Sequence, residues 1–141
     1  MADTGFQGDV SVEETWAGLE RDPRAQILDV RTQPEWNFVG LPDLGVLDRQ
    51  CHLVSWQAWP EMAIDPQFVE RVRAAGLSED MPLYVLCRSG QRSRAAAEVL
   101  AASGFLATYN IADGFEGPKD EAGHRGGVGG WKAAGLPWVQ G

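Results

Sequence analysis

Short apolar runs alternate with stretches of helix-forming residues along most of the chain. Runs rich in β-branched and aromatic residues, at 25–30, 52–56, 83–86 and 108–112, have the composition of buried strands, and Asp9 with Val10 is expected to add a brief edge strand. Helices are expected between them, at 12–22, 67–75 and 94–103. Because strands that alternate with helices form βαβ crossovers, the pattern predicts a three-layer α/β/α fold with a central, mostly parallel five-stranded sheet.

Capping signals place the beginnings of two helical segments. Ser11 is followed three residues later by Glu14, which is the spacing of a capping box. The same spacing recurs after Thr32, at the start of a short helical turn in which Trp36 and Phe38 are expected to pack inward.

The periodic pattern breaks down near the carboxyl terminus. The stretch from about 113 to 130 contains seven glycines and no hydrophobic periodicity. It is therefore expected to be a long loop, and loops of this length in compact domains are usually functional or disordered. The whole chain, 1–141, is expected to form a single domain with this Gly-rich loop.

Composition limits the classes of partner. The chain has 141 residues, of which 44% are apolar and 23% charged, and its formal net charge is −8. This acidic balance argues against general binding to nucleic acid or to an anionic membrane. No apolar run is long enough to span a bilayer, and residues 1–10 lack the basic and apolar regions of a secretory signal. A cytoplasmic location is the expectation, and the two cysteines are then expected to be reduced.

One peptide, 87–93, carries a candidate for covalent chemistry. It reads Cys-Arg-Ser-Gly-Gln-Arg-Ser and joins the strand at 83–86 to the helix at 94–103. The carboxyl ends of strands in open α/β sheets are where ligands bind, and backbone N–H groups at a helix N-terminus favour an anion. Since a thiol in that setting is stabilised as the nucleophilic thiolate, Cys87 is the candidate nucleophile.

Local charge supports this interpretation over that of an inert core cysteine. The stretch from 81 to 112 contains three arginines, Arg88, Arg92 and Arg94, and only one acid, Glu98. Basic residues in a first helical turn are unfavourable to the helix dipole unless an anion is held there. The alternative is a small buried cysteine beside a solvated helix face.

Three segments together resemble the rhodanese family of single-domain sulfurtransferases. Residues 87–93 resemble the family's active-site loop, 27–36 resemble its strand ending in Asp-Val-Arg, and 130–137 resemble its closing Gly-Trp…Gly-Leu-Pro segment. The resemblance implies that Cys87 carries a persulfide during transfer of sulfane sulfur, with no cofactor. It further implies an anionic donor such as thiosulfate, and as acceptor cyanide, a low-molecular-weight thiol or a protein thiol. The persulfide-binding loop would be Arg88, Ser89, Gly90, Gln91, Arg92 and Ser93.

Four further residues are candidates for supporting roles. Asp29 and Arg31 are expected to form a buried ion pair or strand-end hydrogen bond that braces the sheet beside the active loop, rather than to act directly in catalysis. His124 and Arg125 lie in the Gly-rich loop, and we hypothesise that this loop folds over the Cys87 pocket and that both help to bind donor or acceptor. The cysteines and histidines lack the spacing of a metal site, so none is expected.

Two alternatives remain open. The first is a relay or binding module in which Cys87 receives sulfur from one protein and passes it to another. The second is a cysteine-dependent phosphatase, because some cell-cycle phosphatases share the rhodanese fold. Their pattern places Arg six positions after the cysteine, where this chain has Ser93, with Arg92 one position earlier. The shorter loop favours a sulfur-sized anion.

Overall fold

The computed structural model describes residues 5–58 and 60–140. Its centre is a five-stranded sheet in the order β1-β8-β7-β2-β4, and all of its strand pairs are parallel. The expected α/β fold and five-stranded sheet are therefore confirmed, and the sheet is parallel throughout. The strands are β1 (Phe6–Val10), β2 (Gln26–Asp29), β4 (His52–Leu53), β7 (Leu83–Leu86) and β8 (Thr108–Ile111).

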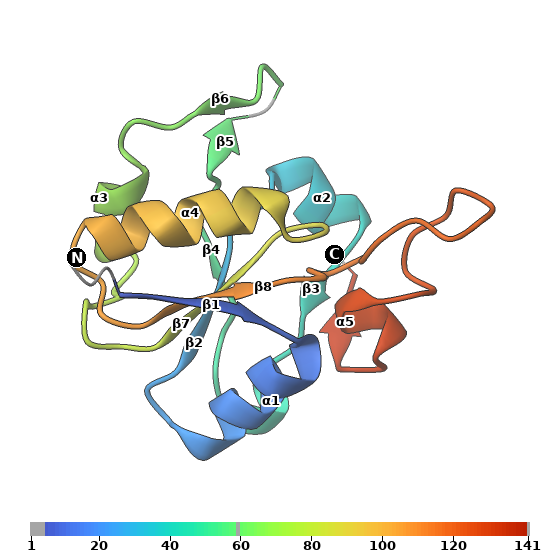
Figure 1. The fold of residues 1–141 in the computed structure, drawn as a ribbon, viewed down its shortest axis with the longest axis horizontal. Coiled ribbons are helices and arrows are strands. Elements are labelled where there is room, and N and C mark those ends of the chain that lie inside the picture. Colours follow the sequence, from blue (N-terminus) through green and yellow to red (C-terminus); the bar gives the residue numbers. More distant parts are fainter. Residues whose placement is uncertain (1–4, 59, 141) are drawn as a thin grey trace.

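Helices cover both faces of this sheet (Figure 1). α3 (Phe68–Ala74) and α4 (Gln91–Ala102) pack on one face, and α1 (Val12–Arg21) with α5 (Gly130–Ala133) on the other. α2 (Gln33–Phe38) is a shorter helix that follows β2.

Alternation along the strands produces two separate apolar cores. On β7, Val85 belongs to the core under α3 and α4, whereas Tyr84 and Leu86 belong to the core under α1. Successive side chains of a strand point to opposite faces, so a strand covered on both sides is apolar throughout. Cys87 continues this alternation and packs in the core under α3 and α4.

Several boundaries differ from the sequence expectation. α4 begins at Gln91 rather than at Arg94, so half of the expected active-site loop lies in the first helical turn. Of the strand expected at 52–56 only His52–Leu53 forms a ladder with β2. The inward packing expected for Phe38 is wrong, because its side chain is 76% exposed. α2 is a six-residue helix, and none of its residues is buried.

Two small antiparallel ribbons were not predicted. β3 (Leu41–Pro42) pairs with β9 (Trp138–Val139), and β5 (Gln57–Ala58) pairs with β6 (Ala63–Ile64). A two-residue strand is too short to show a periodic pattern in the sequence. Whether it forms depends on its pairing with a distant segment or across a tight turn. A 3₁₀ turn, η1 (Gly45–Leu47), lies between β3 and β4. No helix in the described ranges has the length and apolar character to cross a membrane.

Trp131 is expected to be a major contributor to stability. Its side chain is fully buried, contacts the ring of Trp16 edge to face at 5.9 Å, and donates from Nε1 to the carbonyl of Pro137 at 2.7 Å. Trp131→Ala should lower the free energy of unfolding by about 3–5 kcal/mol, measured by urea denaturation. Val128→Ala, at a 61% exposed position, is the control and should change it by less than about 0.5 kcal/mol. Equal stability of the two variants would contradict this role.

Candidate active site

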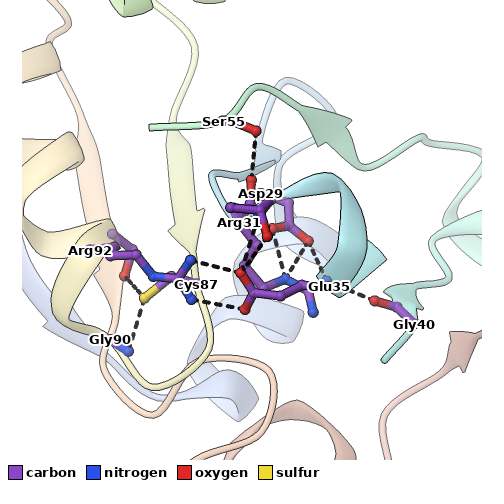
Figure 2. A network of polar contacts seen from close by, with 10 residues as sticks. Asp29, Arg31, Glu35, Gly40, Ser55, Cys87, Gly90 and Arg92 are labelled. Atoms are coloured by element: carbon purple, nitrogen blue, oxygen red, sulfur yellow. Dashed lines mark hydrogen bonds and ion pairs between the residues drawn. The ribbon is translucent and has the colours of Figure 1, made fainter. Parts of the chain in front are cut away.

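Cys87 lies directly after β7, where the chain turns into α4. Its side chain is 1% exposed, and the backbone N–H of Gly90 donates to its Sγ at 3.1 Å (Figure 2). The sulfur is therefore held at the N-terminal end of a twelve-residue helix. An amide donor and the positive end of the helix dipole both favour negative charge at this point.

Gly90 is required by the close approach of two backbones. It has φ 102°, in the left-handed region, and a Cβ built there would lie 1.9 Å from the carbonyl oxygen of Ala112. Any other residue would have to displace backbone at this point. The turn that brings the Gly90 amide to the sulfur depends on this glycine.

The first part of the Gly-rich loop is fixed against the turn at 87–90. The N–H of Phe115 donates to the carbonyl of Cys87 at 2.8 Å, and that of Glu116 to the carbonyl of Arg88 at 3.0 Å. The Phe115 side chain is fully buried. The segment at 113–130 forms no helix or strand before Gly130, as expected, but its beginning is docked under residues 87–88.

A cavity of about 600 Å³ opens beside the cysteine. Its lining includes apolar side chains, from Pro34, Val39 and Met62, as well as charged ones. Met62 has φ 59°, which is uncommon for a residue other than glycine and is often found at functional sites. Four residues of the peptide 87–93 besides the cysteine line the cavity: Arg88, Ser89, Gln91 and Arg92.

The arginines of the peptide differ in their surroundings. Arg92 makes a bidentate ion pair with Glu35, with Nη1–Oε1 and Nη2–Oε2 distances of 2.8 and 2.9 Å, and each side chain is 19% exposed (Figure 2). Arg94 faces Asp9 at 3.4 Å. Arg88 is exposed and has no ion-pair partner among the described residues, which leaves its charge available at the cavity.

The Glu35–Arg92 pair has a defined effect on both pKa values. Burial opposes ionisation of Glu35, but hydrogen bonds from Arg92 and Thr32 and the Arg92 charge outweigh it and hold the pKa of Glu35 below its ordinary value. Hydrogen bonding to Glu35 raises the pKa of Arg92, against burial. Both groups are therefore ionised at neutral pH, and the carboxylate neutralises the charge of a guanidinium that lines the cavity.

Asp29 and Arg31 form a fully buried ion pair at the end of β2. Arg31 Nη2 lies 2.6 Å from Asp29 Oδ2 and also donates to the carbonyl of Gly40 at 2.8 Å. The guanidinium carbon lies 4.4 Å from the centre of the Phe115 ring, and the Arg31 carbonyl accepts from Ser55 Oγ at 2.8 Å. Burial works against the charge of Arg31, but Asp29 outweighs it and raises the pKa of Arg31. Neither residue is among those that line the cavity, so the pair braces the surrounding segments.

The residues of the Gly-rich loop separate into two groups. Arg125 lines the cavity together with Glu116, and its Nη1 donates to the carbonyl of Gly117 at 2.8 Å. The side chain of His124 is exposed and is not among the described residues that line the cavity. The structure thus places one member of the expected pair at the site.

Sequence reasoning missed a hydrogen-bond partner of the site. Ser93 Oγ lies 3.2 Å from Cys87 Sγ and 2.5 Å from Asn110 Oδ1, and all three residues are buried. The amide side chain of Asn110 within a strand expected to be buried was the available signal, because a buried polar group needs a partner. Glu35 was interpreted only as the capping residue that follows Thr32, so its ion pair with Arg92 was not predicted.

The second cysteine, Cys51, lies away from Cys87. Cys51 packs with the core under α1, on the opposite face of the sheet from Cys87. Burial, together with the negative charge of Asp29, raises the pKa of the Cys51 thiol well above its ordinary value. His52, beside it, lies 3.2 Å from Gln26 Oε1 through its Nε2. Across the described ranges, no group of three or more His, Cys, Asp or Glu side chains could hold a metal ion.

The parallel sheet and the buried cysteine at the turn from β7 to α4 define the class: this is a rhodanese-like α/β protein. Among relatives, rhodanese-like domain-containing protein 4 of the chloroplast of Arabidopsis thaliana is 28% identical over 131 residues, which are 92% of this chain and 25% of that protein. The profile of the STR4 middle domain matches residues 7–141, so the chain belongs to that family.

Other relatives match over most of their length. The crystal structure of Rv0390 from M. tuberculosis has a TM-score of 0.87 and 42% identity, over 96% of this chain and 99% of that one. Protein RP600 of Rickettsia prowazekii is 35% identical over 114 residues, covering 81% of this chain and 82% of that protein. The polysulfide-sulfur transferase homodimer of Wolinella succinogenes, 21% identical with a TM-score of 0.64 over 94% of this chain and 78% of that one, shares the fold.

The Glu35–Arg92 pair is expected to give stability a specific pH dependence. Because folding lowers the pKa of Glu35, the pair contributes fully above the ordinary glutamate value, about 4.3, and the contribution is lost as the pH falls through the lowered value. The difference in free energy of unfolding between wild type and Glu35→Gln should therefore be constant near neutrality and shrink below about pH 4.3. Urea denaturation across pH measures it, with Glu121→Gln in the exposed loop as control. A difference that persists undiminished in acid would refute the assignment.

Proposed function

We propose that this protein is a sulfurtransferase that moves sulfane sulfur from a thiosulfate-like donor to a thiophilic acceptor through a persulfide on Cys87. The observation that carries the proposal is the contact of the Gly90 amide with Cys87 Sγ, at the helix N-terminus and beside a cavity. A nucleophilic thiolate at an anion-favouring position suits attack on an anionic sulfur donor.

The reaction divides into two steps. The Cys87 thiolate attacks the outer sulfur of thiosulfate, the S–S bond of the donor breaks, and sulfite leaves with the bonding electron pair. Cys87 then carries a persulfide anion, and the total charge is the same before and after. A cyanide ion or a thiolate next attacks the terminal sulfur and restores the Cys87 thiolate. Two-step transfer of this kind has ping-pong kinetics.

Charge at the cavity supports an anionic donor. Arg92 is committed to Glu35, so the cations that face the cavity without a carboxylate partner are, among the described residues, Arg88 and Arg125. Both can attract a donor to the Cys87 sulfur without fixing its geometry, as lone rim charges do. The name of the Wolinella relative, a polysulfide-sulfur transferase, supports the same reaction class for a protein of this fold.

A persulfide relay to a protein partner is the second candidate. The cavity volume, about 600 Å³, is that of a site for a drug-sized ligand, and thiosulfate would fill only a small part of it. Its apolar residues, Pro34, Val39 and Met62, would gain nothing by contacting the thiosulfate anion, but they suit the apolar part of an acceptor that carries a thiol. A phosphatase is disfavoured because Arg92 is held by both oxygens of Glu35.

Persulfide formation on Cys87 is the direct test. Intact-mass measurement after incubation with thiosulfate should show a gain of one sulfur, about 32 Da, that disappears on addition of cyanide. Cys87→Ser should show no gain, and Cys51→Ser, the matched control, should gain as wild type does. Absence of the adduct with thiosulfate and with polysulfide would overturn the proposal. Hydrolysis of an aryl phosphate without any adduct would point to the phosphatase instead.

The two neighbours in the Gly-rich loop should differ in their effect on the donor. Arg125→Gln should raise the KM for thiosulfate roughly two- to fivefold with little change in kcat, because a partly exposed charge that lines a cavity contributes a modest attraction. His124→Gln, at an exposed position outside the cavity lining, is the matched control and should leave both constants unchanged. Equal effects of the two substitutions would contradict the assignment of Arg125 to the donor site.

A further inference from the structure

A chain of hydrogen bonds leads from the active-site sulfur to the edge strand β1. Ser93 Oγ lies 3.2 Å from Cys87 Sγ and 2.5 Å from Asn110 Oδ1. Asn110 Nδ2 donates to Asp9 Oδ1 at 2.9 Å and to the carbonyl of Gly90 at 3.1 Å. Cys87, Ser93 and Asn110 are at most 2% exposed, so water does not substitute for these partners.

The partners of Asn110 fix the direction of every bond in the chain. The Asp9 carboxylate and the Gly90 carbonyl only accept hydrogen bonds, so the amide nitrogen of Asn110 must face them and its oxygen must face Ser93. The Ser93 hydroxyl has a single proton, and it is donated to that oxygen. Ser93 therefore turns its lone pairs toward Cys87 and accepts from the thiol S–H.

This direction is unfavourable for a thiolate. A negative sulfur 3.2 Å from the lone pairs of Ser93 is repelled, and relief requires the hydroxyl to rotate toward the sulfur. That rotation leaves Asn110 Oδ1 without a donor in a buried place, which is costly. In a persulfide the negative charge lies on the outer sulfur, and the inner sulfur beside Ser93 is neutral. The same hydroxyl direction then carries no such penalty.

We propose that Asn110 is a positioning residue for Cys87: by holding the Ser93 proton away from the sulfur, it disfavours the thiolate and so favours the sulfur-loaded protein over the empty one. The loading half of this inference rests on the proposed sulfurtransferase function, whereas the effect on the thiolate does not. Loading itself is the balanced step already given, in which thiolate and thiosulfate become persulfide and sulfite, and no oxidant is needed.

Other charged groups set the background against which this effect acts. From the cavity side these are Arg88, Glu116, Arg125 and the Glu35–Arg92 pair, and from β1 and α4 behind Asn110 they are Asp9 and Arg94. The variants described next keep all of these charged side chains, but Asn110→Leu also removes the hydrogen bonds of Asn110 Nδ2 to Asp9 and to the carbonyl of Gly90. The comparison with Ser93→Ala, given below, separates that loss from the direction of the hydroxyl.

The first experiment measures the alkylation of Cys87 by iodoacetamide as a function of pH, resolved from Cys51 by peptide mass spectrometry. Only the thiolate reacts. Asn110→Leu frees the Ser93 proton for the sulfur, so the pH midpoint should fall and the rate below it should rise roughly tenfold, as expected for a hydrogen bond to a charged group. Asn110→Ala is the second variant should the leucine not fold. A midpoint unchanged or raised would overturn the proposal.

Two comparisons separate positioning from a purely structural role. Thr108→Val removes another buried hydrogen bond on β8, that of Thr108 Oγ1 to the carbonyl of Ala97 at 3.1 Å, and should leave the alkylation profile unchanged. Because Asn110 acts through Ser93, Ser93→Ala should erase the effect of Asn110→Leu, so the double variant should match Ser93→Ala. Additive effects of the two substitutions would overturn the route through Ser93.

The second experiment measures loading at a fixed ratio of thiosulfate to sulfite, at a pH above the alkylation midpoint. The ratio of persulfide to empty protein, read from intact mass, should be roughly tenfold lower in Asn110→Leu than in wild type, since the variant stabilises the thiolate by that factor. An equal ratio in both would overturn the loading half. A wild type that gains no sulfur would instead overturn the proposed function, and the alkylation profile would still decide the role of Asn110.

Discussion

The buried ion pair of Asp29 and Arg31 is the interaction on which the surroundings of the site depend. Through Arg31 it joins the end of β2 to the carbonyl of Gly40, to Ser55 and to the ring of Phe115. A buried pair gains little net stability over apolar packing, but loss of one partner leaves an uncompensated charge. The main effect of the pair is therefore to fix the relative positions of the segments that contain Gly40, Ser55 and Phe115. Its net contribution to stability is secondary.

Backbone hydrogen bonds connect this ion pair, through Phe115, to the position of Cys87. Phe115, which stacks on Arg31, donates from its N–H to the carbonyl of Cys87, and Glu116 donates to that of Arg88. On the other side of the turn, Gly90 touches the backbone of Ala112 at a distance that admits no side chain. The turn at 87–90 thus packs against the end of β8 and the segment that follows it, which holds the Gly90 amide against the sulfur.

Electrostatics at the site are more balanced than a run of arginines suggests. Glu35 neutralises Arg92 and Asp9 faces Arg94, so a positive field over the cavity comes from Arg88 and Arg125. The sulfur itself has one donor, the Gly90 amide, and one acceptor, the Ser93 hydroxyl. The amide favours the anionic sulfur of the proposed cycle, whereas the hydroxyl oxygen favours the protonated or the loaded one.

The sheet, the helices on its two faces and the position of Cys87 after an apolar strand could be predicted from the sequence, because local periodicity, capping residues and glycines report local backbone structure. The ion pair of Asp29 and Arg31, two residues apart, was also predictable. The folded structure was needed to show that Arg92 binds Glu35 and that Arg125, rather than His124, lines the cavity. It likewise decided that Asn110 directs the Ser93 proton away from the sulfur. These contacts join residues far apart in the chain, and the direction of a hydroxyl proton depends on every partner packed around it, so no local pattern encodes them.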